Sequence, residues 1–245
     1  MRAALLLFLA LAALAQTTCL AAEMHVTKGL PHYARDMEFY YQNPRPEILP
    51  GLLRTLADQG VLGHGEKRLV AAAFLGELES QRPATLETLA QSARGLPGEA
   101  GADARRTLAW AAHLARIPNE QGFLDSLLTA RDDTLRGHIG RSPAPLSSWE
   151  ANEPTVPSMF WGAYMASGDT AWLDRLMDAA ARYAELNAAG RQGGPGFAAG
   201  ATAAALLYDM APRHARVQAG VRARLARAKG PEADTLRLIL RESAR

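Results

Sequence analysis

Apolar residues recur at spacings of three and four along most of the chain, which is typical of α-helices that bury one face. Prolines and glycines interrupt this pattern at short intervals, so each predicted helix is short. The pattern predicts helices over residues 32–42, 65–80, 102–116, 158–167, 170–188, 198–211 and 212–228. Further helices are expected to begin at Pro46 or Pro50, after Pro83, after Pro118 and at Pro231. Because residues 198–211 are nearly all apolar, that helix is predicted to be central.

The clearest predicted joint between two helices is Gly168-Asp169. Glycine ends helices because it adopts the left-handed conformation readily, and aspartate caps the first turn of the helix that follows. Two amphipathic helices joined in this way form an αα-hairpin. We therefore predict an all-α fold of roughly nine to eleven short helices, stacked as antiparallel αα-hairpins in a solenoid-like or compact array.

The longest predicted loop covers residues 137–157. It contains six residues that interrupt helices, namely Gly137, Gly140, Pro143, Pro145, Pro154 and Pro157. Glycine and proline at this density argue against a regular helix. We expect the loop to act either as a hinge or as a lid over a functional site.

The composition supports a helical fold and narrows the function classes. The chain has 49 Ala and 35 Leu but only 6 Val and 4 Ile, and strands favour the β-branched residues that are scarce here. A large β-sheet is thereby excluded, together with the enzyme scaffolds built on one. The net charge of +2 argues against a nucleic-acid-binding protein, which would carry a marked basic excess.

The N-terminal residues have the three parts of a secretory signal peptide. Met1-Arg2 is a short positive start, residues 3–15 are a continuous apolar run, and Ala13-Leu14-Ala15 is a small-x-small cleavage pattern. We expect cleavage near Ala15, or as late as Ala22, so that residues 1–22 are signal peptide and leader and residues 23–245 are a single all-α domain. An uncleaved anchor is the second interpretation. The expected location is the periplasm or the exterior.

The single cysteine, Cys19, follows this apolar run. A lipoprotein signal has a cysteine in the same place, preceded by a small residue and, three positions earlier, by an aliphatic one. Thr18 and Gln16 occupy those positions, so we do not expect lipidation at Cys19. One cysteine cannot form a disulfide within the chain.

Two short segments of the sequence resemble segments of other proteins. The first is Phe-Trp-Gly-Ala-Tyr-Met-Ala-Ser-Gly-Asp over residues 160–169, followed by Trp172 and Leu173, and the second is Asp-Met-Glu-Phe-Tyr-Tyr over residues 36–41. Both segments resemble stretches of uncharacterised exported proteobacterial proteins of unknown function. The resemblance implies an all-α exported domain and carries over no catalytic residue.

Few residues of the sequence have the spacing that a catalytic or metal-binding motif requires. No two of the six histidines lie within six residues of each other, which excludes the His-Glu-x-x-His zinc motif. His32 and Asp36 are one helical turn apart and form either a weak metal site or, as we expect, an ordinary surface pair. We expect neither a metal nor a cofactor.

The best enzymatic site that the residues offer lies in the 137–157 loop. Glu150 and Glu153 could serve as acid and base for the cleavage of a sugar bond, and the neighbouring Trp149 could stack on a sugar. An acidic, aromatic loop is more often only solvated. Glu150 and Glu153 are therefore candidates for catalysis and are not assigned to it, and Trp149 is assigned to binding.

A basic helix is the second candidate surface. At 100° per residue, one side of residues 212–228 carries the four arginines Arg213, Arg216, Arg224 and Arg227. Val217, Val221 and Leu225 occupy the opposite side. Such a ridge could meet an acidic protein or an anionic membrane surface, or it could simply be solvated.

We therefore expect a periplasmic or secreted helical protein that acts by binding another protein of the cell envelope, rather than an enzyme. The predicted surfaces are the part of the loop from residue 141 to residue 157, around Trp149, and the arginine ridge. An envelope hydrolase that acts on glycans through Glu150 and Glu153 is the alternative.

Overall fold

The computed structural model describes residues 32–241. Internal contacts divide the chain into two units, Met1–Phe39 and Tyr40–Arg245. In the first unit, the described residues form the short helix α2 (His32–Glu38). The expected signal peptide and Cys19 lie outside the described residues, and so their predictions remain untested.

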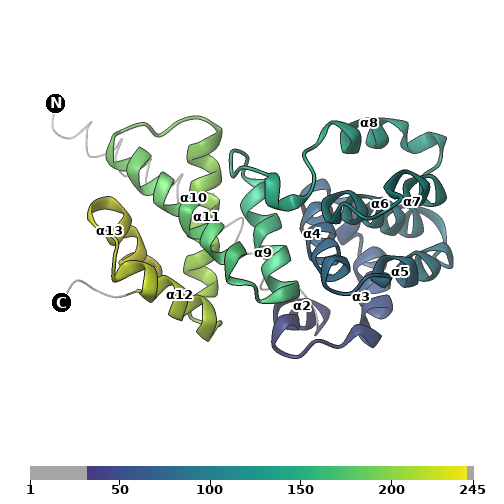
Figure 1. Cartoon of the computed structure of the whole chain (residues 1–245), viewed down its shortest axis with the longest axis horizontal. Helices are drawn as coiled ribbons and strands as arrows, with labels where there is room; N and C mark the ends of the chain where they lie inside the picture. Colours follow the sequence, from purple (N-terminus) through teal and green to yellow (C-terminus); the bar gives the residue numbers. More distant parts are fainter. Residues whose placement is uncertain (1–31, 242–245) are drawn as a thin grey trace, which may run out of the picture. The chain divides into compact units, whose positions relative to one another are not determined.

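The second unit is built from helices, and the described residues contain no strand, which confirms the all-α prediction (Figure 1). Its α-helices are α3 (Leu49–Asp58), α4 (Gly65–Gln81), α5 (Thr85–Arg94), α6 (Gly98–Ala115), α7 (Glu120–Leu127), α8 (Asp133–Arg141), α9 (Thr155–Ser167), α10 (Thr170–Ala188), α11 (Pro195–Met210), α12 (Ala215–Leu225) and α13 (Gly230–Ile239). The described part of this unit also has five 3-10 helices. Two precede α3, η1 (Tyr40–Gln42) and η2 (Pro46–Ile48), and three lie between the α-helices, η3 (Val61–Gly63), η4 (Ala130–Asp132) and η5 (Leu146–Ser148).

Helices α4 and α9 pack against each other and so connect the helices that contact α4 with those that contact α9. Helix α4 packs against α6 on one side and against α9 on the other, and α9 in turn contacts α10 and α11 (Figure 1). Helices α9 and α10 form the predicted αα-hairpin. Gly168 between them is left-handed, with φ 65°, and the Asp169 side chain accepts a hydrogen bond from the backbone N–H of Ala171 at 2.9 Å. Both residues thus have the roles that the sequence predicts.

Glycines allow the principal helix pairs to approach closely. A Cβ atom at Gly162 of α9 would lie 2.5 Å from the carbonyl oxygen of Val70 on α4, and one at Gly76 of α4 would lie 2.9 Å from that of Ala111 on α6. Between α10 and α11, a Cβ at Gly200 would lie 2.6 Å from the oxygen of Ala179. These distances are shorter than van der Waals contact, so a larger residue would push the helices apart.

The predicted 137–157 loop is too long, because residues 133–141 form the helix α8. Gly137 and Gly140 lie inside this helix, although each costs about 1 kcal/mol relative to alanine. Ile139 offsets that cost by being almost completely buried, and Arg136 ties the helix to the oxygen of Leu128 at 2.8 Å. The irregular segment is residues 142–154, interrupted by η5.

Two predictions near the C-terminal end also need correction. The basic helix begins at Ala215 and not at Pro212, because residues 211–213 form a turn and His214 caps the helix. Helix α11 contacts α9, α10 and α13, but it is not enclosed on all sides, since Tyr208 on it is 37% exposed. Most of the apolar residues of α11 are alanines, and an alanine side chain is small enough to lie on a half-exposed helix face.

Candidate functional site

The loop of residues 142–154 is held against α10 by Arg175. The guanidinium of Arg175 donates to the carbonyl oxygen of Trp149 at 2.7 Å and also to that of Ser147, and it lies 5.0 Å from the ring centroid of Phe160. The indole N–H of Trp149 donates to the oxygen of Pro143 at 2.6 Å. The half-buried Arg175 and the indole of Trp149 therefore fix the path of the loop.

The two carboxylates that are candidates for catalysis lie on the outer side of this loop. Glu150 and Glu153 are both exposed. Glu150 accepts a hydrogen bond from the side-chain amide of Asn152 at 3.0 Å, and the oxygen of that amide accepts one from Arg182 at 3.3 Å. Neither carboxylate lines the cavity beside the loop. The side chains are thus presented to solvent rather than to an enclosed site.

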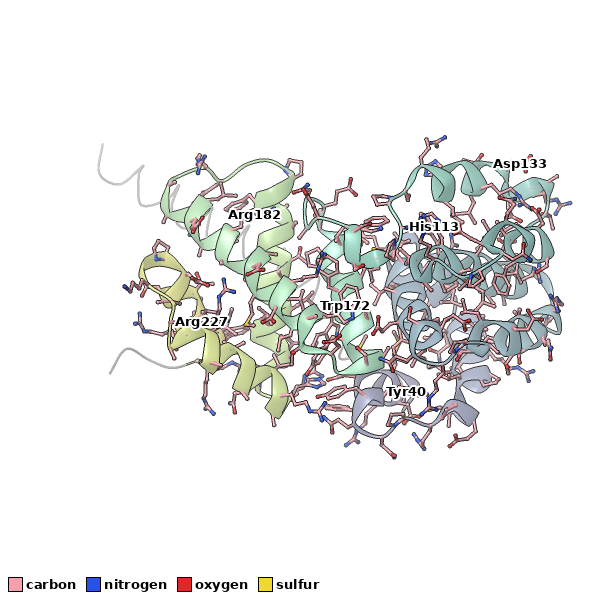
Figure 2. All side chains as sticks on the ribbon, in the orientation of Figure 1. Tyr40, His113, Asp133, Trp172, Arg182 and Arg227 are labelled. Atoms are coloured by element: carbon pink, nitrogen blue, oxygen red, sulfur yellow. The ribbon has the colours of Figure 1, made fainter. Side chains whose placement is uncertain are left out.

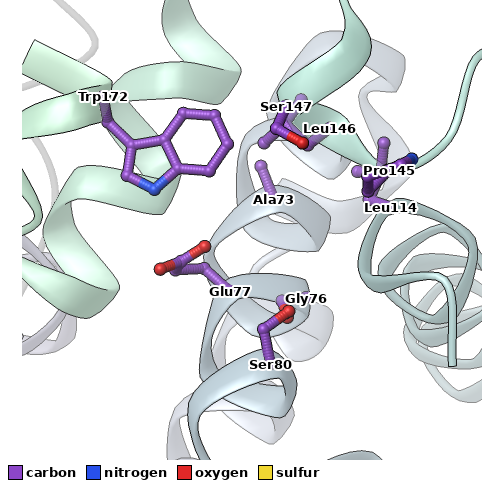
Figure 3. A pocket seen from close by; sticks show the side chains of 9 residues that line it. All are labelled: Ala73, Gly76, Glu77, Ser80, Leu114, Pro145, Leu146, Ser147 and Trp172. Atoms are coloured by element: carbon purple, nitrogen blue, oxygen red, sulfur yellow. The ribbon is translucent and has the colours of Figure 1, made fainter. Parts of the chain in front are cut away.

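A small cavity of about 80 Å³ lies on the inner side of the loop (Figure 3). It lies among α4, α6, the start of α10 and the 142–154 loop. The residues that line it are Ala73, Gly76, Glu77, Ser80, Leu114, Pro145, Leu146, Ser147 and Trp172. Figure 3 shows the carboxyl group of Glu77 beside the nitrogen edge of the Trp172 indole. Glu77 is the one carboxylate in this lining.

The environment of Glu77 disfavours its charged form. Burial raises the pKa of the Glu77 carboxyl above its ordinary value, and the negative charge of Asp169 adds to the rise. Polar hydrogens of Trp172, Gln81 and Ser167 partly offset this by stabilising the carboxylate, and the Gln81 amide donates to Oε1 at 3.3 Å. A shifted carboxyl in a cavity is a candidate functional group.

Glu77 is not among the residues predicted from the sequence, although a signal is present there. On α4, Glu77 lies one turn beyond Ala73 and Phe74, so it falls within the apolar stripe of that helix. A carboxylate at such a position either pairs with a cation or lines a cavity. Recognising the cavity required the tertiary structure, because the loop and α10 supply its other walls.

A larger cavity of about 420 Å³ lies elsewhere, between α5 and the start of α7. Glu79 is one of its carboxylates, and it accepts hydrogen bonds from the backbone N–H groups of Ala84 and Leu86 at 3.1 and 2.8 Å. These bonds cap the first turn of α5. The Glu79 carboxylate of this cavity therefore already caps the start of α5.

The four arginines of the predicted ridge do not all lie on α12. Arg213 and Arg227 lie outside α12, and Arg213 pairs with Asp209 at 3.0 Å. The guanidinium of Arg216 lies 5.5 Å from the ring centroid of Tyr41. The basic groups are therefore distributed over different local environments.

Arg224 has the firmest contacts of the four arginines. Its Nε lies 2.6 Å from Glu232 and its guanidinium nitrogen lies 2.8 Å from Asp178. The hydrogen bond that it donates to Glu232 raises the pKa of Arg224 further. Arg227 is exposed. The structure thus places three of the four arginines in contacts within the chain, and sequence spacing could not show the long-range contacts of Arg216 and Arg224.

Metal-binding clusters and membrane-spanning helices are both absent from the described residues. Residues 32–241 hold no group of three or more His, Cys, Asp or Glu side chains arranged to bind a metal ion. None of the helices in this part of the chain combines the length and the apolar character needed to cross a bilayer. Comparisons with protein-family models, curated proteins and solved structures find no match to the chain. The resemblance to exported proteobacterial proteins therefore stays a prediction.

Proposed function

We propose that the protein binds another protein through the loop of residues 142–154. The observation that carries this proposal is the fixation of the loop by Arg175, which donates to two carbonyl oxygens of the loop. A loop that is already ordered loses little conformational entropy when a partner binds to it. Exposed loops on a rigid scaffold are common binding elements.

The side chains on the outer side of the loop give the partner a charge preference. Glu150 and Glu153 are exposed there, while Trp149 is half-buried and keeps its indole edge bonded to Pro143. Two carboxylates on an ordered loop favour a partner with a basic surface. The loop is better supported than the arginine ridge as a binding surface, because Arg213, Arg216 and Arg224 already make contacts within the chain. The alternative that the arginines contact an anionic membrane is therefore less well supported than binding through the loop.

We also propose that binding takes place outside the cytoplasm. The three-part N-terminal pattern supports export, and the partner would then belong to the cell envelope. The mass of the mature protein recovered from the periplasm tests this step, with cleavage expected near Ala15 or as late as Ala22. Recovery of the full-length chain from the cytoplasm alone would contradict export.

Retrieval of partners from an envelope extract at low salt tests the binding proposal. The full-length chain and the variant Glu150→Ala/Glu153→Ala serve as paired baits. Glu185→Ala is the matched control, because Glu185 is also exposed but lies on α10. We expect a stoichiometric partner with the wild type and the control, and its loss with the double variant. A partner retained equally by all three would contradict the role of the loop.

The alternative of a glycan hydrolase has less support. Both of its carboxylates are exposed, whereas acid–base pairs of this class face each other across a cleft at about 5–10 Å. Glu150→Gln and Glu153→Gln test it directly. Hydrolysis of an envelope glycan that both substitutions abolish would favour this alternative over the binding proposal.

A further inference from the structure

We infer that the cavity beside Glu77 binds a primary ammonium group carried on an aliphatic stem. The cavity of about 80 Å³ combines one carboxylate with apolar walls and two hydroxyl groups (Figure 3). This site is distinct from the outer side of the loop, and it does not require a protein partner.

The carboxylate end of the cavity lacks a cation. In the part of the chain that the structure describes, no Lys, Arg or His side chain forms an ion pair with Glu77. Asp169 adds a second negative charge to its surroundings. Arg175, whose guanidinium bonds the Ser147 oxygen, is directed at the loop backbone and the Phe160 ring. The half-buried carboxylate has no counter-ion and is stabilised only by the hydrogen bonds from Trp172, Gln81 and Ser167. A cation that entered the cavity would add the opposite charge that these donors do not supply.

The walls of the cavity match the rest of such a ligand. Ala73, Leu114 and Leu146 offer apolar surface for methylene groups. The hydroxyls of Ser80 and Ser147 can accept hydrogen bonds from an ammonium group, which has three donors and no acceptor. The small volume accommodates a chain of a few carbons more readily than a ring. The same environment is less suited to an anion, since Glu77 would repel it.

Two sources offer this chemistry, the side chain of a lysine in another protein and a free alkylamine. Both present the same ammonium group on the same kind of stem. A lysine differs in its flanking backbone, which could make contacts at the mouth of the cavity. The two sources are therefore separated by comparing a lysine derivative with a simple amine.

The protonation of Glu77 gives the binding a defined pH dependence. Below the raised pKa of Glu77 the carboxyl group is neutral and attracts the ammonium weakly, whereas above it the carboxylate is charged. The charge of Asp169 acts on the same group and raises the pKa of Glu77 further. Affinity should therefore increase as the pH rises from acid to neutral, while the amine stays protonated up to about pH 10.

Titration of the full-length chain followed by NMR tests the inference. The probes are butylammonium chloride and Nα-acetyl-lysine amide, with Nα-acetyl-norleucine amide as the uncharged control. The signal is the indole N–H resonance of Trp172, identified by its loss in Trp172→Phe. We expect saturable shifts with the two ammonium probes and none with the norleucine derivative.

The variants decide whether Glu77 is responsible. Glu77→Gln keeps the size of the side chain and should weaken binding of both ammonium probes about tenfold or more. Glu185→Gln, at an exposed carboxyl on α10 outside the cavity, should leave the affinity unchanged. Tighter binding of the lysine derivative than of butylammonium would identify a protein lysine as the source, and equal or weaker binding would identify a free amine.

Either of two results would overturn the inference: no shift with either ammonium probe at about 100 mM, or equal affinity in wild type and Glu77→Gln. Neither result bears on the proposed partner of the 142–154 loop, because the Glu150→Ala/Glu153→Ala bait leaves the cavity lining intact.

Discussion

The hydroxyl of Tyr41 lies 3.0 Å from Nδ1 of His214, a fully buried ring that is 173 residues further along the chain. The Tyr41 ring also lies 5.1 Å from that of Tyr164 on α9, measured between centroids. Trp161 completes the cluster, with its ring centroid 5.1 Å from that of His214. Figure 2 draws the side chains of the described part of the chain on the ribbon. This aromatic cluster therefore joins η1, α9 and the cap of α12 within one buried region.

Replacing Tyr41 by phenylalanine should destabilise the protein through loss of this bond. The buried Nδ1 atom of His214 would lose the Tyr41 hydroxyl as its partner, and losing a buried hydrogen bond costs about 1–3 kcal/mol. Urea denaturation followed by far-UV circular dichroism measures the change. Tyr208→Phe is the control, because Tyr208 is 37% exposed, and its effect should stay within about 0.5 kcal/mol. Equal effects of the two substitutions would contradict the importance of the bond.

The close approach of α4 and α9 predicts that Gly162 cannot be enlarged. In Gly162→Ala the new Cβ would lie 2.5 Å from the Val70 oxygen, so the helices must separate, at a cost of about 1–3 kcal/mol. Gly51→Ala is a matched control on α3, where no neighbouring group lies within 4 Å of the position that the new methyl group would take. There the better helix propensity of alanine should stabilise the protein by about 0.5–1 kcal/mol. Thermal unfolding that shifts both variants in the same direction would contradict this account.

Most of the fold could be predicted from the sequence, because short-range patterns decide it. The stripe of apolar residues in α10 and the Gly168-Asp169 joint predict the bounds of that helix correctly. The α8 helix is not predicted because its two glycines signal a loop, whereas the burial of Ile139 outweighs them. Tertiary burial of this kind has no local signature.

The candidate site could be predicted only in part. The sequence pattern points to the loop around Trp149, but the carboxylate that lines the cavity beside this loop is Glu77, on a helix whose pattern is that of ordinary core. Similarly, the spacing of Arg224 indicates an open ridge, while the fold brings Asp178 to it from 46 residues away. Contacts between distant segments decide both cases, and a single sequence does not encode them in its spacing.

Arg224 should contribute to the attachment of α12. Its guanidinium bonds Glu232 on α13 and Asp178 on α10, so Arg224→Gln should lower the free energy of unfolding by about 1–2 kcal/mol. The loss should be smaller in about 1 M NaCl, because salt screens partly exposed ion pairs. Arg227→Gln is the control and should change the unfolding free energy by less than about 0.5 kcal/mol. A loss for Arg224→Gln that does not depend on salt would point to packing rather than charge.

Glu77 should contribute less to the stability of the protein at neutral pH than at acid pH. Because its pKa is raised in the folded state above the ordinary 4.5, the folded protein holds this proton more tightly than the unfolded chain does. That favourable contribution is complete below about pH 4.5 and is lost as the pH rises through the folded pKa.

Glu77→Gln should therefore increase the free energy of unfolding at pH 7, since the neutral amide never carries the poorly solvated charge. The difference from wild type should shrink as the pH falls toward 4, where both side chains are neutral. Urea denaturation of both proteins at a series of pH values measures this difference, with Glu150→Gln as the exposed control, which should show no such trend. If Glu77→Gln instead lowered the free energy of unfolding equally at every pH, Glu77 would stabilise the fold through its hydrogen bonds. Its charge would then not be the destabilising feature that we predict.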